Sequence, residues 1–137
     1  MTTLDCRILL AEDCTDTQRL ISHMLRKAGA EVIVAADGQA AVQCVVDAEA
    51  EGRPFDLILM DMQMPILDGF SATRRLRQEG HRGPIVAFTA LAASGDREAC
   101  IGAGCDEYLT KPVERERLLG VISSFAKKRQ PGGKLSA

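Results

Sequence analysis

Five polar side chains follow apolar runs of the kind that form buried strands. They are Glu12 and Asp13 after residues 7–11, Asp61 after residues 55–60, Thr89 after residues 84–88, and Lys111 after residues 106–109. If these runs are parallel strands of one sheet, their carboxyl ends meet at one edge, where open α/β sheets bind ligands. The sequence therefore predicts three carboxylates, one hydroxyl and one ammonium at a common place. Burying each charged group there costs free energy of folding unless the group is paired with an opposite charge or a hydrogen-bond partner.

This set of side chains suits phosphoryl transfer. Three clustered carboxylates repel one another, and a hard divalent cation with oxygen ligands, Mg²⁺, relieves that repulsion. Magnesium sites combine one or two carboxylates with water and a substrate phosphate, and Lys111 and Thr89 can bind the remaining phosphate oxygens. A carboxylate can itself accept the phosphoryl group. Asp61 is the candidate acceptor because it is the lone carboxylate that ends a central apolar run.

Each of these residues also has an ordinary structural explanation. Asp13 could be a turn residue, Thr89 a helix N-cap, and Lys111 a surface charge. A common site is favoured because all of them fall at strand ends, which separate loop and cap residues would not require.

The elements that must position these residues alternate along the whole chain. Strands are expected at Arg7–Ala11, Glu31–Ala35, Phe55–Met60, Pro84–Phe88 and Asp106–Leu109, and three of them are apolar without alternation, as in a parallel sheet covered on both faces. Helices are expected from Thr15 or Asp16, as cap, to Gly29, from Asp37-Gly38 to Gly52, from Asp68-Gly69 to Gly80, over Ser94–Ala103, and after Pro112 through Phe125. This is a (βα)5 pattern of class α/β, a doubly wound parallel five-stranded sheet.

Composition narrows the function classes. The chain has 137 residues, a formal charge of −2 and 46% hydrophobic residues, which fits one globular domain. No basic cluster points to nucleic acid, no apolar run is long enough for a membrane span, and residues 1–6 lack an apolar signal core, so a cytoplasmic location is expected. The basic residues Arg74, Arg75 and Arg77 are interpreted as a solvated helix face.

The cysteines and histidines do not suggest a structural metal. Five cysteines without a C-x-x-C pair and only two histidines argue against a disulfide framework and against a zinc site. Cys14 is the thiol of interest, because it falls in a loop beside acidic residues.

At these motifs the chain resembles a known family. The matching segments are Ile8–Asp13, Asp61–Pro65 with Asp68-Gly69, Phe88-Thr89-Ala90 and Tyr108–Pro112, over about residues 5–127. Together they resemble the receiver domains of two-component response regulators. The segments around Asp61 and at Ala103–Tyr108 are most similar to receivers attached to hybrid sensor histidine kinases.

The resemblance implies a role for each site residue. Asp61 would accept the phosphoryl group, while Glu12, Asp13 and the backbone carbonyl of Gln63 would hold Mg²⁺ with it. Glu12 is longer than aspartate, so its metal contact could run through water. Thr89 and Lys111 would contact the phosphoryl oxygens, and Tyr108 would be the aromatic switch that follows Thr89. A cis bond is expected at Lys111–Pro112.

The resemblance also implies an organisation and partners. Residues 5–128 would form a flavodoxin-like receiver domain with strand order 2-1-3-4-5, and residues 129–137 a flexible C-terminal tail. A histidine kinase or phosphotransfer domain would donate the phosphoryl group, and a downstream protein would bind the face of the fourth helix, fifth strand and fifth helix. Such a domain is a signalling module in a phosphorelay, not an enzyme, with only self-catalysed phosphoryl transfer and slow autodephosphorylation. Neither nucleic acid nor membrane is an expected partner, and the motifs leave open whether the natural protein is a single domain or part of a hybrid kinase.

Three other functions compete with this reading. A magnesium-dependent aspartyl phosphatase needs a second Asp two residues after the nucleophile, where this chain has Gln63. A flavin or nucleotide binder needs a phosphate loop after the first strand, where Glu12 and Asp13 would repel phosphate, and no G-x-G-x-x-G occurs. A metal-independent interaction domain leaves the strand-end carboxylates unexplained.

Overall fold

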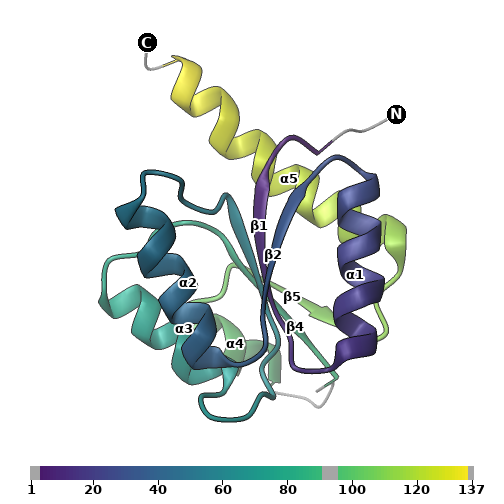
Figure 1. Cartoon of the computed structure of the whole chain (residues 1–137), viewed down its shortest axis with the longest axis vertical. Helices are drawn as coiled ribbons and strands as arrows, with labels where there is room; N and C mark the ends of the chain where they lie inside the picture. Colours follow the sequence, from purple (N-terminus) through teal and green to yellow (C-terminus); the bar gives the residue numbers. More distant parts are fainter. Residues whose placement is uncertain (1–3, 91–95, 136–137) are drawn as a thin grey trace.

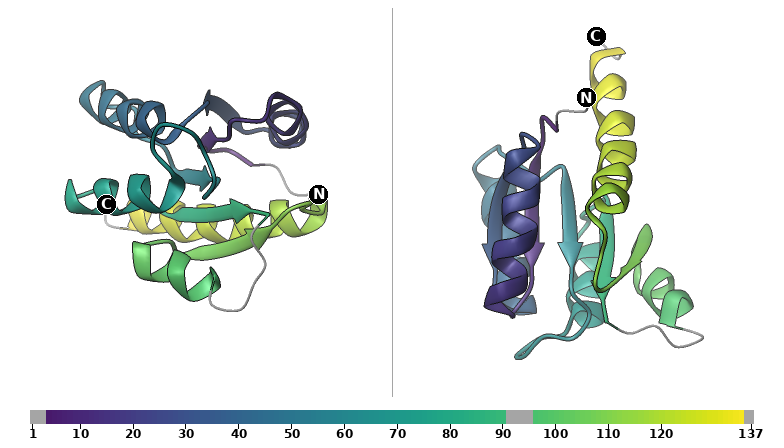
Figure 2. Two further views of the ribbon diagram at one scale, coloured as in Figure 1. Left: turned by 90° about the horizontal axis from the view of Figure 1, so that it is seen from below. Right: turned by 90° about the vertical axis from the view of Figure 1, so that its right-hand side faces the viewer.

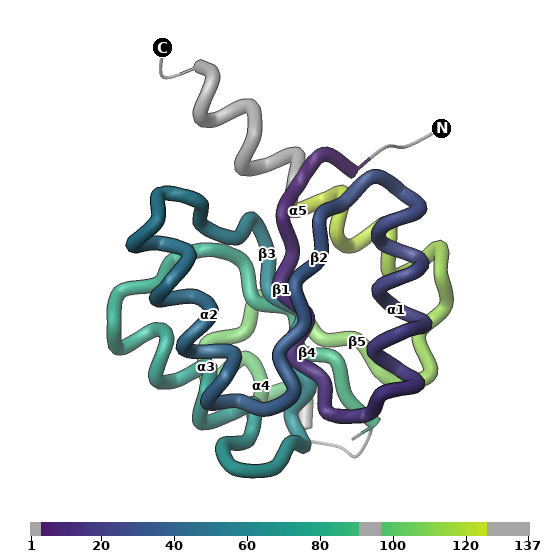
Figure 3. Tube along the Cα trace, viewed as in Figure 1, coloured from purple at the N-terminus to yellow at the C-terminus, as the bar shows by residue number. Residues whose placement is uncertain are grey.

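The computed structural model describes the backbone of residues 4–90 and 96–135, and the side chains of residues 4–90 and 97–125 (Figure 3). Strands and helices alternate, in the order β1 (Arg7–Ala11), α1 (Thr15–Lys27), β2 (Glu31–Ala35), α2 (Gly38–Ala50), β3 (Leu57–Met60), α3 (Gly69–Gln78), β4 (Ile85–Thr89), α4 (Asp96–Ala103), β5 (Glu107–Thr110) and α5 (Arg115–Leu135). The expected first helical residues 94–95 lie outside the described residues. Residues 129–135 of the expected tail continue α5, and their side chains are not described.

The five strands form one parallel sheet in the order β2-β1-β3-β4-β5. This confirms the predicted α/β class, the doubly wound (βα)5 pattern and the order 2-1-3-4-5. The carboxyl ends of these strands lie at one edge, because β1 pairs with β3 through Ala11 and Met60, β3 pairs with β4, and β4 pairs with β5 through Thr89 and Thr110.

The later strands begin one or two residues after their predicted starts. β3 begins at Leu57 because the Asp56 carboxylate turns back to accept the backbone N–H of Arg7 at 2.7 Å. β4 begins at Ile85 because Pro84 has no N–H to donate to a neighbouring strand. β5 runs from Glu107 to Thr110, and just before it the Asp106 carboxylate, rather than a backbone carbonyl, accepts the N–H of Ile85 at 2.9 Å.

Helices cover both faces of the sheet (Figures 1 and 2). α2, α3 and α4 bury residues such as Val45, Leu76 and Cys100 against one face, and α1 and α5 bury Leu25 and Ile122 against the other. The middle strands are covered on both sides, which is why their sequences are apolar without alternation. No helix in the described part of the chain is long and apolar enough to cross a membrane.

Caps fix where the helices begin. Asp37 and Asp68 cap α2 and α3, accepting the N–H of Ala40 at 2.7 Å and of Ser71 at 2.8 Å. The expectation that Thr15 or Asp16 caps the first helix is wrong, because Cys14 occupies the N-cap of α1. The chain turns at Cys14 because its backbone N–H is already held by the Glu12 carboxylate at 2.9 Å.

Candidate functional site

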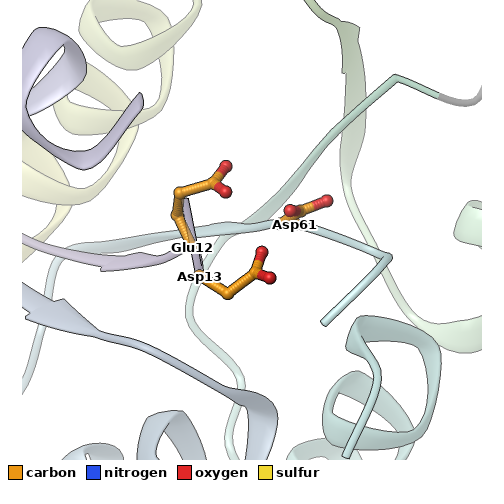
Figure 4. A group of neighbouring side chains, drawn as sticks. All are labelled: Glu12, Asp13 and Asp61. Atoms are coloured by element: carbon orange, nitrogen blue, oxygen red, sulfur yellow. The ribbon is translucent and has the colours of Figure 1, made fainter. Parts of the chain in front are cut away.

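Three carboxylates meet at the carboxyl ends of β1 and β3 (Figure 4). Glu12 and Asp13 come directly after β1, and Asp61 comes directly after β3. One oxygen from each lies within 4.8 Å of the others. Glu12 is fully buried and Asp61 is 3% exposed, whereas Asp13 is exposed, so the cluster opens to solvent on the Asp13 side.

The backbone holds these carboxylates in place. The N–H of Asp61 donates to the carbonyl of Ala11 at 3.0 Å, and the N–H of Glu12 donates to the carbonyl of Ala35 at 2.9 Å. α3 begins so close to this point that a Cβ on Gly69 would lie 2.2 Å from the carbonyl oxygen of Asp61. Only glycine permits that approach, which explains the Asp68-Gly69 pair in the sequence.

Lys111 reaches the cluster from the end of β5. Its Nζ lies 2.6 Å from Oε1 of Glu12 and 3.1 Å from Oδ2 of Asp61, and 5.0 Å from the centre of the Phe88 ring. Its backbone N–H donates to the carbonyl of Thr89 at 2.8 Å, which ties the ends of β4 and β5 together. The Lys111–Pro112 bond is cis, as predicted.

The charges at this edge do not balance. Burial raises the pKa of Glu12, although the ammonium of Lys111 and the N–H of Cys14 act in the opposite direction. Burial acts to lower the pKa of Lys111, but its hydrogen bonds with Glu12 and Asp61 outweigh it and the pKa is raised. Three carboxylates and one ammonium leave an excess of two negative charges when all are ionised, and burial strengthens their repulsion.

Nearby donors hold the carboxylate of Asp61 and the backbone at Glu12. Oδ1 of Asp61 accepts the backbone N–H of Gln63 at 3.1 Å, and the amide of Gln18 donates to the carbonyl oxygen of Glu12 at 2.6 Å. Sequence reasoning missed Gln18 and the N–H of Cys14. The position of Gln18 inside α1 carried no signal beyond helical spacing. Every residue except proline has a backbone N–H, so the sequence does not mark the one that donates.

The oxygen-rich cluster fits a hard divalent cation. All of its side-chain ligand atoms are carboxylate oxygens, they are close enough to share one ion, and the excess negative charge matches a doubly charged cation. The predicted metal residues Glu12, Asp13 and Asp61 are therefore brought together, and exposed Gln63 follows them in the β3–α3 loop.

Thr89 and Tyr108, the predicted switch residues, lie on neighbouring strands. Thr89 ends β4 and is fully buried. Tyr108 lies on β5 opposite Ala87, and its partly buried side chain packs against the core under α2, α3 and α4. The two residues are thus two strand positions apart on adjacent strands.

Known proteins match both the sequence and the fold. The sequence model of the response regulator receiver domain family matches residues 8–123. The two-component response regulator ORR41 of Oryza sativa subsp. japonica is 42% identical over 122 residues, which cover 87% of this chain and 93% of that protein. The hybrid signal transduction histidine kinase I of Dictyostelium discoideum is 40% identical over 122 residues, which cover 86% of this chain but 7% of that protein. The chain therefore spans a small part of the hybrid kinases that it matches.

One similar solved structure contains a metal ion. The receiver domain of the sensor histidine kinase PA1611 from Pseudomonas aeruginosa PAO1, with a magnesium ion coordinated in its active-site cleft, is 43% identical and has a TM-score of 0.78. The alignment covers 90% of this chain and 99% of that one.

Proposed function

The chain belongs to the response regulator receiver domain family, and from this premise we propose that it takes a phosphoryl group from a histidine kinase or phosphotransfer domain onto Asp61. The observation that carries the proposal is the buried carboxylate of Asp61, 3.1 Å from the ammonium of Lys111 and beside two further carboxylates. In this reading residues 5–128 act as a cytoplasmic receiver domain, a signalling module in a phosphorelay.

We assign the magnesium site to Glu12, Asp13 and Asp61, with the backbone carbonyl of Gln63 as a further ligand. The excess negative charge of the cluster and its solvent-facing Asp13 support this assignment. Bound Mg²⁺ would supply positive charge beside the transferring phosphoryl group. Glu12 is held by Lys111 and by the N–H of Cys14, so we assign it an outer contact through water.

In the transfer step, an oxygen of Asp61 attacks the phosphorus of the phosphohistidine. The new O–P bond forms as the N–P bond breaks, and the electron pair of that bond returns to the imidazole ring of the donor. Lys111 then pairs with an oxygen of the phosphoryl group in place of its contact with the free Asp61 carboxylate. The hydroxyl of Thr89 donates to a second phosphoryl oxygen.

Phosphorylation would reach a downstream partner through Thr89 and Tyr108. A short threonine hydroxyl must move toward the site to reach the phosphoryl group, and the space it leaves can be filled by the ring of Tyr108 from the adjacent strand. Two packings that differ by a few kcal/mol can be biased by one phosphoryl group. The surface that changes would be that of α4, β5 and α5, to which the downstream protein binds.

The proposal is tested with a small phosphodonor and Mg²⁺. We expect the intact protein to gain one phosphoryl mass, and Asp61→Asn to abolish the gain. Asp47→Asn, which removes an exposed carboxylate on α2, is the matched control and should label like the wild type. Labelling of Asp61→Asn at the wild-type level would refute the assignment.

The switch needs its own measurement. We expect the NMR signals of the Tyr108 ring to shift when a phosphoryl mimic binds with Mg²⁺, and Thr89→Ala to remove that shift while leaving the mimic bound. A Tyr108 ring that is unaffected in the wild type would rule out this route.

A further inference from the structure

Ile66, in the β3–α3 loop, has two features that are unfavourable in an isolated domain. Its φ angle is +71°, in the left-handed region, and its side chain is 76% exposed. Every other residue with a positive φ in the described part of the chain is a glycine: Gly29, Gly52, Gly80 and Gly104. A β-branched residue is among the least suited to this conformation.

The loop around Ile66 is held on both sides. The N–H of Leu67 donates to the carbonyl of Pro65 at 2.7 Å, which closes a tight turn centred on Ile66. The carbonyl of Leu67 accepts the N–H of Gly38 at 3.0 Å at the start of α2. A Cβ on Gly38 would lie 2.0 Å from that same carbonyl oxygen, so loop and helix are in close contact. The turn is therefore fixed by its neighbours, and the isoleucine adapts to it.

In the part of the chain that the structure describes, the isoleucine at this turn gains little in return for its strain. Glycine or asparagine adopts a left-handed φ with less strain, and a polar side chain suits an exposed position. With three quarters of its surface in solvent, Ile66 gains little burial in return. A molecule that covered this apolar side chain would bury it and so offset the strain of the turn.

The loop that carries Ile66 lies against the phosphorylation site. Pro65 and Asp68, on either side of the turn, line a surface groove together with Met62, Met64, Phe70, Asp13 and Gln63. Asp13 and Gln63 are also residues assigned to the magnesium site. A protein that brings a phosphohistidine to Asp61 must approach the same surface.

We propose that Ile66 is a docking residue for the phosphodonor protein, which covers its side chain with an apolar patch beside the phosphohistidine. This inference rests on the proposed function. Ile66 contacts neither the phosphoryl group nor the metal in this reading. It selects protein donors, and small phosphodonors do not use it.

The test compares two donors on the same variants. The protein donor is the fastest of a panel of histidine phosphotransfer domains, each phosphorylated on its histidine beforehand, and the small donor is acetyl phosphate with Mg²⁺. Ile66→Gly and Ile66→Asn should lower kcat/KM for the protein donor by about tenfold or more, the loss expected when an isoleucine is no longer buried. Their rates with acetyl phosphate should equal that of the wild type. Both variants should also resist urea better than the wild type, because the strain at φ +71° is relieved.

Two further variants sharpen the result. Ile66→Leu keeps an apolar side chain and should retain most of the transfer from the protein donor. Val46→Ser removes another exposed apolar side chain, on α2 and outside the groove, and should change neither rate.

Each of the following outcomes would contradict the proposal, and each for a different reason. Equal losses with both donors would mean that Ile66 shapes the site itself, and unchanged transfer from the protein donor would mean that Ile66 is not covered. Labelling by acetyl phosphate without transfer from any domain of the panel would contradict a protein donor of this class. Failure of acetyl phosphate to label the wild type would instead overturn the proposed function.

Discussion

The two edges of the sheet both gather charged side chains, but they use them differently. At the amino-end edge, the guanidinium of Arg77 donates to the carbonyls of Gly104, His81 and Gly83 and to the carboxylate of Asp106, all at 2.9 Å. At the carboxyl-end edge, the ammonium of Lys111 pairs with Glu12 and Asp61 in a cluster of three carboxylates. At the amino-end edge the positive charge of Arg77 is matched by the Asp106 carboxylate and by carbonyl acceptors. The carboxyl-end cluster is left with excess negative charge.

This difference distinguishes charges that stabilise the fold from charges that need a ligand. Arg77 joins α3 to the loops before β4 and β5, so its hydrogen bonds stabilise the fold without any ligand. Buried like charges destabilise a domain unless something else binds to them. The excess charge is therefore the feature that points to a cation and a phosphoryl group, and variants at the two edges should have opposite effects.

The largest effect is expected at the carboxyl-end edge. Glu12→Gln with Asp13→Asn should weaken Mg²⁺ binding by about 1000-fold, because two of three carboxylates are lost. Isothermal titration calorimetry measures the affinity. The free energy of unfolding without metal should not fall, since burial raises the pKa of Glu12 and its charge is present at a cost.

The control for this pair removes two exposed carboxylates elsewhere, with Asp47→Asn and Glu79→Gln. It should bind Mg²⁺ as the wild type does. Wild-type affinity in the Glu12 and Asp13 variant would place the metal at another site.

The second effect is expected at the amino-end edge. Arg77→Met should lower the free energy of unfolding by about 3 kcal/mol, because three carbonyls and the Asp106 carboxylate lose a partly buried donor. Urea denaturation measures the loss. Arg75→Met, on the exposed side of the same helix, is the control and should cost little. If the two variants are equally stable, the Arg77 network does not support the fold.

Arg77 also shows where sequence reasoning ends. The order of strands and helices and the meeting of Glu12, Asp13, Asp61 and Lys111 were predicted, because apolar runs and strand ends are local patterns. The interpretation of Arg74, Arg75 and Arg77 as one solvated face holds for the exposed Arg74 and Arg75 but is wrong for Arg77. One of its acceptors, the carbonyl of Gly104, is 27 residues away in sequence but close in space. Because every residue has a backbone carbonyl, no residue type marks such an acceptor in the sequence.

Cys14 and Ile66 show the same limit at the other edge. The N-cap of α1 was predicted from side-chain preference, but the carboxylate of Glu12 holds the N–H of Cys14 and fixes the turn there. Ile66 has no sequence pattern that marks a left-handed residue, because the turn is set by contacts with Gly38 and Pro65.

The cysteines extend the comparison to reactivity. Hydrogen bonds from Thr17 lower the pKa of exposed Cys14 near the site, whereas burial raises the pKa of Cys6 and of Cys105, at the amino-end edge, to about 11. At pH 8 we expect iodoacetamide to modify Cys14 about 100 times faster than the other two, because a thiol of pKa about 11 is almost entirely protonated. Peptide mass spectrometry over time measures the three rates. Similar rates at Cys14 and Cys6 would contradict the difference between the two edges.

The smallest effect is expected at Arg53, on the same edge as Arg77. Its guanidinium lies 3.3 Å from a Glu31 oxygen, but the side chain of Arg53 is 60% exposed and that of Glu31 is 48% exposed. Arg53→Ala should therefore lower the free energy of unfolding by no more than about 0.5 kcal/mol, and about 1 M salt should remove the difference. The backbone carbonyl of Arg53, which accepts a hydrogen bond from Arg7, remains in the alanine variant. Urea denaturation of both proteins at low and high salt measures the effect. A loss as large as that of Arg77→Met would mean that any ion pair at this edge stabilises the fold. A small loss would show that Arg77 stabilises the fold because it is less exposed and donates to three carbonyls besides the Asp106 carboxylate.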